Sequence, residues 1–327
     1  MRLVTVFYIA VLIAGLAAPF MGLYPVYLMT LYCFAIFACA FNLLLGYGGM
    51  LSFGHAAYFG FAAYTTSWLV TAHGLSSVPA IVAGVLASAL MGLVIGLIAI
   101  RRSGIYFAMI TLALAQVVYF VCLQAPFTGG ENGLQGVPRG SLLGLVSLEK
   151  DEVMYYFVLA SLVAVYLFIQ RVVHSPFGQV LKAIRENEPR AISLGYNVDR
   201  YKLLVFVLSA GLAGLAGSLK SLVLGFATLS DVLQSTSGEV ILMTLLGGAG
   251  TFFGPVLGAG IVVTLQDMLS DRVGSWVTVI IGVIFVVCVM AFRKGVVGEL
   301  LAYLERRRQA AKAVDLAKTN PVATPHA

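Results

Sequence analysis

Charged side chains are scarce in this sequence. Asp, Glu, Lys and Arg make up only 10% of its 327 residues, against roughly 25% in an average soluble domain. From Leu3 to Ile100 there is none of them. Because a membrane-spanning helix needs about 20 mostly apolar residues, this stretch alone is long enough for about four or five spans. A soluble protein, or a soluble enzyme with a single membrane anchor, is therefore excluded.

The sequence also lacks the alternation of apolar and polar residues that is typical of membrane β-barrel strands. Its apolar runs are continuous, with 60% hydrophobic residues and a mean hydropathy of +0.98, and backbone groups within lipid are satisfied inside helices. We therefore expect an all-α polytopic membrane protein with about ten transmembrane or partly re-entrant helices. The expected helices cover residues 3–20, 27–45, 55–72, 79–100, 104–124, 152–170, 203–223, 239–250, 254–270 and 276–292.

Motifs for an energy source or a reaction are absent as well. The sequence has no phosphate-binding loop, zinc-protease motif or nucleophile elbow. It also has no cluster of carboxylates within the apolar runs, of the kind that proton or sodium coupling needs. Its four cysteines lie in apolar runs without metal-binding spacing. We therefore expect a non-catalytic chain without a disulfide framework, a metal site or a cofactor.

The positions of Lys and Arg predict the orientation, because short cytoplasmic loops carry an excess of these residues. The pair Arg101–Arg102, the loop 171–202 and the tail 299–327 are basic, whereas the loop 125–151 carries more acidic than basic residues. We expect the basic segments and both termini in the cytoplasm, and the loop 125–151 on the outer side. The transmembrane domain then covers 1–298.

This orientation requires an odd number of crossings after the helix expected at 203–223. The apolar run that follows is split by Gly247, Gly248 and Gly250 into two pieces. The first piece, 239–250, is too short for a full span. A tilted crossing and a re-entrant hairpin buried in protein are equal alternatives for it.

A glycine-rich segment, 41–60, lies within the charge-free run and combines five glycines with polar side chains. Such a segment is typical of a discontinuous helix that lines a transport path, although glycines also serve simply to pack helices. A lone histidine in a membrane helix more often bonds a neighbouring helix than relays protons. The candidate path residues, in this segment and in the helix 104–124, are Asn42, Ser52, His55, Thr111 and Gln116.

The loop 171–202 predicts two short helices. Leu181 and Ile184 recur at helical spacing, and Pro189 fits the first turn of a second helix over 188–193. Two such helices make a surface on which another protein docks, whereas the alternative is a solvated basic loop held by lipid headgroups. The candidate docking residues are Ala183, Arg185, Glu186, Glu188, Arg190, Ala191 and Gly195.

The outer loop is rich in glycines and amide side chains. This composition predicts a structured turn that shapes an outer mouth or contacts a partner, or an ordinary connection. Its candidate residues are Gly129, Gly130, Asn132 and Gly133.

Three segments in this order, Asn42–Gly60, Ser175–Gly195 and Leu245–Ala259, closely resemble the branched-chain amino-acid ABC transporter permeases of the LivM type. The resemblance implies a multi-pass protein of the bacterial inner membrane that works with a second related permease, two cytoplasmic ABC ATPases and a periplasmic substrate-binding protein. ATP is then bound by the partner subunits. The coupling contact with the ATPases is implied at Ala183 to Gly195.

The coupling loop departs from the general ABC importer pattern at one point. That pattern places a Glu six residues before the glycine, whereas here Pro189 stands at that place and Glu188 precedes it. The contact surface is expected to be kept, but a specific role for Glu188 does not follow from the pattern.

The function that the resemblance implies is ATP-driven import of branched-chain or related neutral amino acids by alternating access. The nearest rival in substrate is an ABC permease for urea or short amides. A rival from another class is a stand-alone channel or ion-coupled carrier. A nucleic-acid partner is not expected, and the bilayer itself is the remaining partner.

Overall fold

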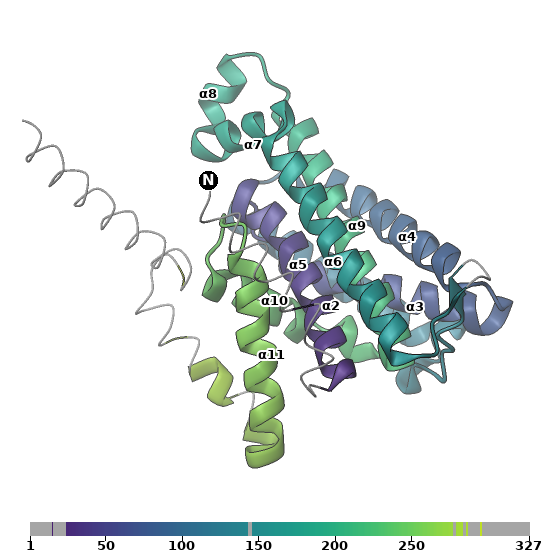
Figure 1. Cartoon of the computed structure of the whole chain (residues 1–327). Coiled ribbons are helices and arrows are strands. Elements are labelled where there is room, and N and C mark those ends of the chain that lie inside the picture. Colours follow the sequence, from purple (N-terminus) through teal and green to yellow (C-terminus); the bar gives the residue numbers. More distant parts are fainter. Residues whose placement is uncertain are drawn as a thin grey trace, which may run out of the picture.

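The computed structural model of the chain is a bundle of helices (Figure 1). It describes residues 15, 24–142, 146–276, 279–283, 286 and 295. The helix expected at 3–20 except for residue 15, most of the one expected at 276–292, and the tail 299–327 lie outside the described residues.

The long helices occupy nearly the ranges that hydropathy predicts. They are α2 (Pro25–Asn42), α3 (His55–His73), α4 (Ser77–Ala99), α5 (Ile105–Gln124), α6 (Asp151–His174), α9 (Val198–Leu224) and α11 (Gly254–Val273). The boundary that differs most is the start of α9, which was expected at residue 203. The Asn197 side chain accepts the backbone N–H of Arg200 at 3.3 Å, and this cap adds a polar first turn to the apolar run.

Shorter elements complete the fold. The expected pair of short helices is confirmed as α7 (Pro176–Glu186) and α8 (Glu188–Ser193). The remaining elements are the π-helix η2 (Leu43–Tyr47), α10 (Gln234–Gly247), the 3-10 turns η3 (Pro126–Thr128), η4 (Gly130–Asn132), η5 (Leu229–Asp231) and η6 (Gly274–Trp276), and the strands β1 (Leu134–Gln135), β2 (Ser141–Leu142), β3 (Val146–Ser147) and β4 (Phe226–Ala227).

Five of the described helices are long and apolar enough to cross a membrane. They are Pro25–Tyr47, Ser77–Ala99, Ile105–Gln124, Asp151–His174 and Val198–Leu224. The central α3 is long enough but less apolar. Most of its residues are buried, chiefly against α9 and α4, and because it meets protein rather than lipid it does not need a fully apolar surface.

Small residues set the spacing between α9 and its neighbours. A Cβ atom added at Gly217 would lie 1.9 Å from the Phe59 carbonyl oxygen, and one added at Gly92 would lie 2.4 Å from the Ala210 Cβ. By contrast, a Cβ at Gly211 would meet the Ala89 Cβ at 3.5 Å, an ordinary contact. The α3–α9 interface therefore has no room for a side chain at residue 217.

Gly217→Ala is accordingly expected to destabilise the purified protein in detergent by about 1–3 kcal/mol, because the new methyl group must displace the backbone of α3. Gly211→Ala is the matched control and should leave the thermal midpoint unchanged. Thermal unfolding followed by fluorescence measures both. Equal midpoints for the two variants would contradict the close α3–α9 contact.

The bundle has two ends, and each gathers segments that are distant in sequence (Figure 1). We call the end that carries α7 and α8 the α7 end. The opposite end, which we call the loop end, carries the connection 125–150, where β1 pairs antiparallel with β4 and β2 with β3. There Arg139 of this connection forms an ion pair with Asp151 and donates to the Val223 carbonyl.

The segment between α9 and α11 is discontinuous. After α9 the chain runs from the loop end into the bundle as irregular backbone with the single turn η5. It passes so close to α3 that backbone atoms of Asp231 and Val232 would lie 2.8 Å from a Cβ atom added at Gly60. Gly60 is about four turns, or about 20 Å, from the end of α3 at the loop end. The short α10 starts at this depth and ends at Gly247. The piece expected at 239–250 therefore belongs to a segment, 225–247, whose first half is irregular and whose second half is α10.

Candidate functional site

The expected break between 41 and 60 joins α2 to α3. The π-helix η2 prolongs α2, and the chain then turns back before α3 begins at His55. The Asn42 amide crosslinks this region to the loop between α10 and α11: its Nδ2 donates to the Thr251 carbonyl at 2.9 Å and its Oδ1 accepts the Gly250 N–H at 2.8 Å. The break is therefore held by two hydrogen bonds from one side chain.

Two other candidate path residues hold the returning segment. Ser52 Oγ accepts the N–H of Gly54, and Thr111 Oγ1 of α5 accepts the N–H of Phe53, both at 3.3 Å. Both side chains are buried. Their hydroxyl oxygens accept hydrogen bonds from backbone N–H groups where the chain is not helical. Irregular backbone inside a membrane protein requires such partners. A fourth candidate, Gln116, is half-buried on α5.

His55 is fully buried and contacts a neighbouring helix. Its Nε2 lies 2.8 Å from Ser209 Oγ of α9, and the same hydroxyl donates to the Ala40 carbonyl at 2.5 Å. Because the hydroxyl proton is used in that bond, Nε2 is the donor to Ser209. The ring packs edge-on against Phe41 and Tyr58, with centroids 5.1 and 5.4 Å away.

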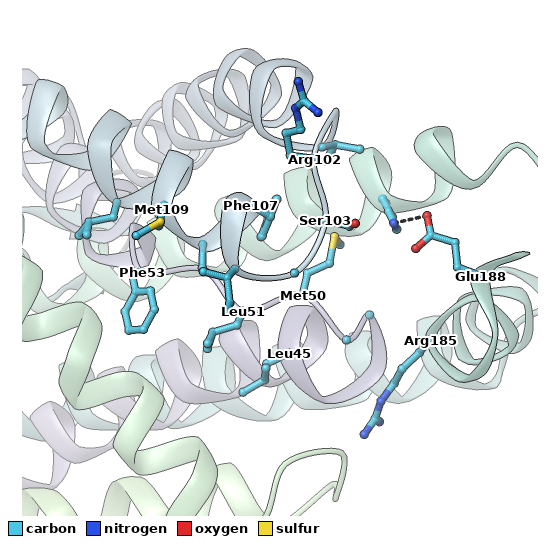
Figure 2. Close-up of a pocket in the computed structure, with 18 of the residues that line it drawn as sticks. Leu45, Met50, Leu51, Phe53, Arg102, Ser103, Phe107, Met109, Arg185 and Glu188 are labelled. Carbon is cyan, nitrogen blue, oxygen red and sulfur yellow. Dashed lines mark hydrogen bonds and ion pairs between the residues drawn. The ribbon is translucent and has the colours of Figure 1, made fainter.

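A cavity of about 900 Å³ opens near the α7 end (Figure 2). Apolar side chains form one wall, and charged side chains of the segment 100–104, α7, α8 and α9 lie at its rim. The apolar wall includes Leu45, Met50, Leu51, Phe53, Phe107, Met109 and Leu112, and the charged residues are Arg102, Arg185, Glu188 and Lys202. Gln234, Leu245 and Ala249, from α10 and the residues after it, complete the lining.

None of the five candidate path residues is among those that line this cavity in the described part of the chain. Asn42, Ser52 and Thr111 instead hold its walls in place. Of the lining residues, only Arg185 and Glu188 were among the candidates predicted from the sequence; the polar lining residues Arg102, Ser103, Lys202 and Gln234 were not. The signal for Gln234 is the polar run Gln234–Glu239 before an apolar helix, which a hydropathy window places outside the membrane.

The two short helices are formed by local caps. Ser175 Oγ accepts the Gly178 N–H, and the Asn187 side chain accepts the Arg190 N–H at 3.0 Å. Ile184 and Ala191 face inward against Val198 of α9. We call α7 and α8 the docking helices, after the role predicted for this loop. Ala191 is a packing residue between them and α9.

Exposed apolar side chains lie at the end of α8 and in the residues that follow it. Ile192 of α8, and Leu194 and Tyr196 after it, are 58%, 68% and 41% exposed at the α7 end. The other candidate docking residues, Ala183, Arg185, Glu186, Arg190 and Gly195, are exposed as well, and Glu188 is half-buried.

Three side chains connect these helices to the rest of the bundle. Arg185 Nη1 donates to the Gly46 carbonyl in η2, and the Arg185 stem lies over Gly49, where an added Cβ would be 2.9 Å from its Cγ. Lys202 Nζ lies 2.6 Å from Glu188 Oε1, the pair drawn with a dashed line in Figure 2. Lys182 Nζ lies 5.9 Å from the Tyr47 ring centroid. A displacement of α7 would therefore act directly on η2.

The turn in the outer loop is ordered. Gly129 and Gly133 have φ values of +76° and +66°, and a Cβ at Gly133 would lie 2.3 Å from the Ala227 carbonyl oxygen. Gly130 begins η4 and Asn132 ends it. The loop is thus packed against the strand that precedes the irregular half of the 225–247 segment. A contact between this loop and a partner stays a prediction.

Comparison with known proteins gives one family and several relatives. The model of the family "Branched-chain amino acid transport system / permease component" matches residues 26–289. The high-affinity branched-chain amino acid transport system permease protein LivM of Escherichia coli K12 is 30% identical over 81% of this chain and 68% of its own length. Its counterpart in Salmonella typhimurium is 29% identical over the same shares.

A probable LivM protein of Methanocaldococcus jannaschii is 26% identical over 62% of this chain and 60% of its own length. No solved structure matches the chain.

Proposed function

The chain belongs to the family of permease components of branched-chain amino acid transport systems, and from this we propose that it is the membrane-spanning subunit of a bacterial ABC importer. It carries branched-chain or related neutral amino acids inward by alternating access. The energy comes from two partner ATPases, which bind the ATP. A second related permease and a periplasmic binding protein complete the complex in the inner membrane.

The observation that carries this proposal is the cavity at the α7 end. Its volume of about 900 Å³ lies in the range of small-molecule sites. The apolar wall suits an aliphatic side chain, and the polar groups at its rim suit the charged backbone of an amino acid. In this proposal the cavity is the inner part of the path and the α7 end faces the cytoplasm.

The docking helices support the coupling part of the proposal. Ile192 of α8 and Leu194, which follows it, present exposed apolar side chains, and Arg185 connects α7 with η2 beside the cavity. ATPases that close on nucleotide would push on this surface. The motion would reach η2 through Arg185 and the loop after α10 through Asn42.

The five candidate path residues stay predictions in this account. Asn42, Ser52 and Thr111 would act by holding the discontinuous helix that bounds the path. His55, which is buried between α3 and α9, would act at the interface on which these helices rock. Gln116 would face the path from α5.

Competition for uptake tests the substrate class. The complete complex in proteoliposomes, with its binding protein outside, is expected to take up labelled leucine, and unlabelled isoleucine and valine should compete. Excess urea should not, because it has no aliphatic side chain for the apolar wall. Uptake of labelled urea that leucine fails to inhibit would replace the amino-acid proposal with the short-amide one.

A further inference from the structure

The start of α10 exposes polar and small residues inside the bundle. Ser230, Gln234, Ser235 and Gly238 are all exposed, beside Leu233, which is 37% exposed, and a Cβ at Gly238 would meet nothing within 4 Å. Yet the backbone of Asp231 packs on Gly60, about 20 Å along α3 from the loop end. Irregular backbone and polar side chains at that depth are not tolerated against lipid. This strip, Ser230–Gly238, therefore faces water or another protein chain.

An ion pair lies directly beneath the strip. Lys220 of α9 bonds Asp231 of η5, with side-chain exposures of 13% and 4%. The Lys220 Nζ also lies 5.7 Å from the ring centroids of both Phe34 and Phe59. Asp231 in turn accepts the Thr228 N–H at 3.4 Å. Ionisable groups within a membrane protein mark functional sites by default, and this pair fixes where α10 begins.

The strip meets the cavity at Gln234, and Ser235 is the next residue along the chain. Gln234 belongs to both, and it lines the cavity together with Leu112 and Leu245, while the charged residues Arg102 and Lys202 lie toward the α7 end. The cavity thus has apolar surface beside an uncharged polar group at membrane depth. A molecule that fits this arrangement has an aliphatic part and a compact polar part.

We propose that Gln234 and Ser235 form the subsite that contacts the ammonium and carboxylate groups of the amino acid in transit, and that Lys220 and Asp231 are positioning residues for it. The inference rests on the proposed function. An amide and a hydroxyl each donate and accept hydrogen bonds, so two uncharged side chains serve both charges of a zwitterion. Because neither side chain carries a net charge, they hold the zwitterion weakly enough to release it, as a transport path requires.

The test compares the double variant Gln234→Leu with Ser235→Ala against Gln124→Leu, an exposed glutamine at the end of α5, in the complete complex in proteoliposomes. Uptake of leucine is expected to fall about tenfold or more in the double variant, since hydrogen bonds to charged groups are worth at least that factor. The loss should be equal for leucine, valine and alanine, which share the same backbone groups. The control should transport normally.

Three results would overturn the inference. They are undiminished uptake by the double variant, a loss that depends on the substrate side chain, and failure of the double variant to assemble with the second permease, which would make the strip a subunit interface. If the unaltered complex takes up no neutral amino acid, the proposed function itself fails. The two failures are thereby distinguished.

The positioning role has its own test. Asp231→Asn leaves the buried Lys220 without its carboxylate, whereas Lys220→Met with Asp231→Leu removes both charges and should keep the fold, because buried pairs are replaceable by apolar residues. We expect both variants to raise the leucine concentration for half-maximal uptake, whereas Lys220→Arg, which keeps a cation beside Asp231, should leave it unchanged. A folded double variant with unaltered transport would reduce the pair to a structural role and refute the positioning.

Discussion

Replacing Arg185 with alanine is expected to lower amino-acid uptake about tenfold or more, because the variant loses the charge-assisted hydrogen bond that joins α7 to η2, while ATP hydrolysis by the assembled complex continues. Arg185 is the side chain of α7 that reaches η2, through the Gly46 carbonyl. It also packs over Gly49 beside the cavity. Without it, movement of the docking helices would no longer reach the break between α2 and α3.

The measurement is the ratio of leucine taken up to ATP hydrolysed in proteoliposomes. Arg171→Ala is the matched control, since Arg171 is an exposed arginine on α6 close to the same end. Arg185→Lys should give an intermediate ratio, because lysine keeps the stem over Gly49 but loses the planar donor group. An unaltered ratio in Arg185→Ala would refute the connection.

The second large effect is expected at the C-terminal end of α8. Changing Ile192 and Leu194 together to aspartate should reduce the amount of ATPase that co-purifies with the permease about tenfold or more, since interface centres depend on a few buried apolar side chains and exclude unpaired charge. Both residues are mostly exposed in the chain alone, so their replacement should leave membrane insertion intact.

Quantitative blotting of the purified complex measures this loss. Leu75→Asp makes a suitable control, because Leu75 is an exposed leucine at the loop end, and it should retain the ATPases. Normal recovery of ATPases with the α8 variant would place their docking surface elsewhere.

The sequence predicts those parts of the fold that depend on local signals. Continuous hydropathy locates the spans, and the capping residues Ser175 and Asn187 locate α7 and α8. The glycines after α10 mark its end. The start of α10 was expected five residues or so too late, because the polar run from Gln234 to Glu239 resembles a loop outside the membrane.

The candidate site was harder to predict, because its contacts join residues that are distant in sequence. Nothing local to Arg185 indicates that it bonds Gly46, or local to Asn42 that it bonds Gly250. Asp231 was overlooked because its partner Lys220 comes from another helix. Polar residues in apolar runs identified the side chains that hold the cavity walls, whereas the lining Gln234 was hidden in a segment of low hydropathy.

The most direct test of the account is leucine uptake into proteoliposomes that contain this chain, its related permease and the two ATPases, with loaded binding protein outside and ATP inside. We predict uptake against a gradient. This uptake should stop when ATP is replaced by a non-hydrolysable analogue, and also when the related permease or the ATPases are omitted. Uptake of leucine by this chain alone, without ATP, would contradict the account and indicate a channel or ion-coupled carrier.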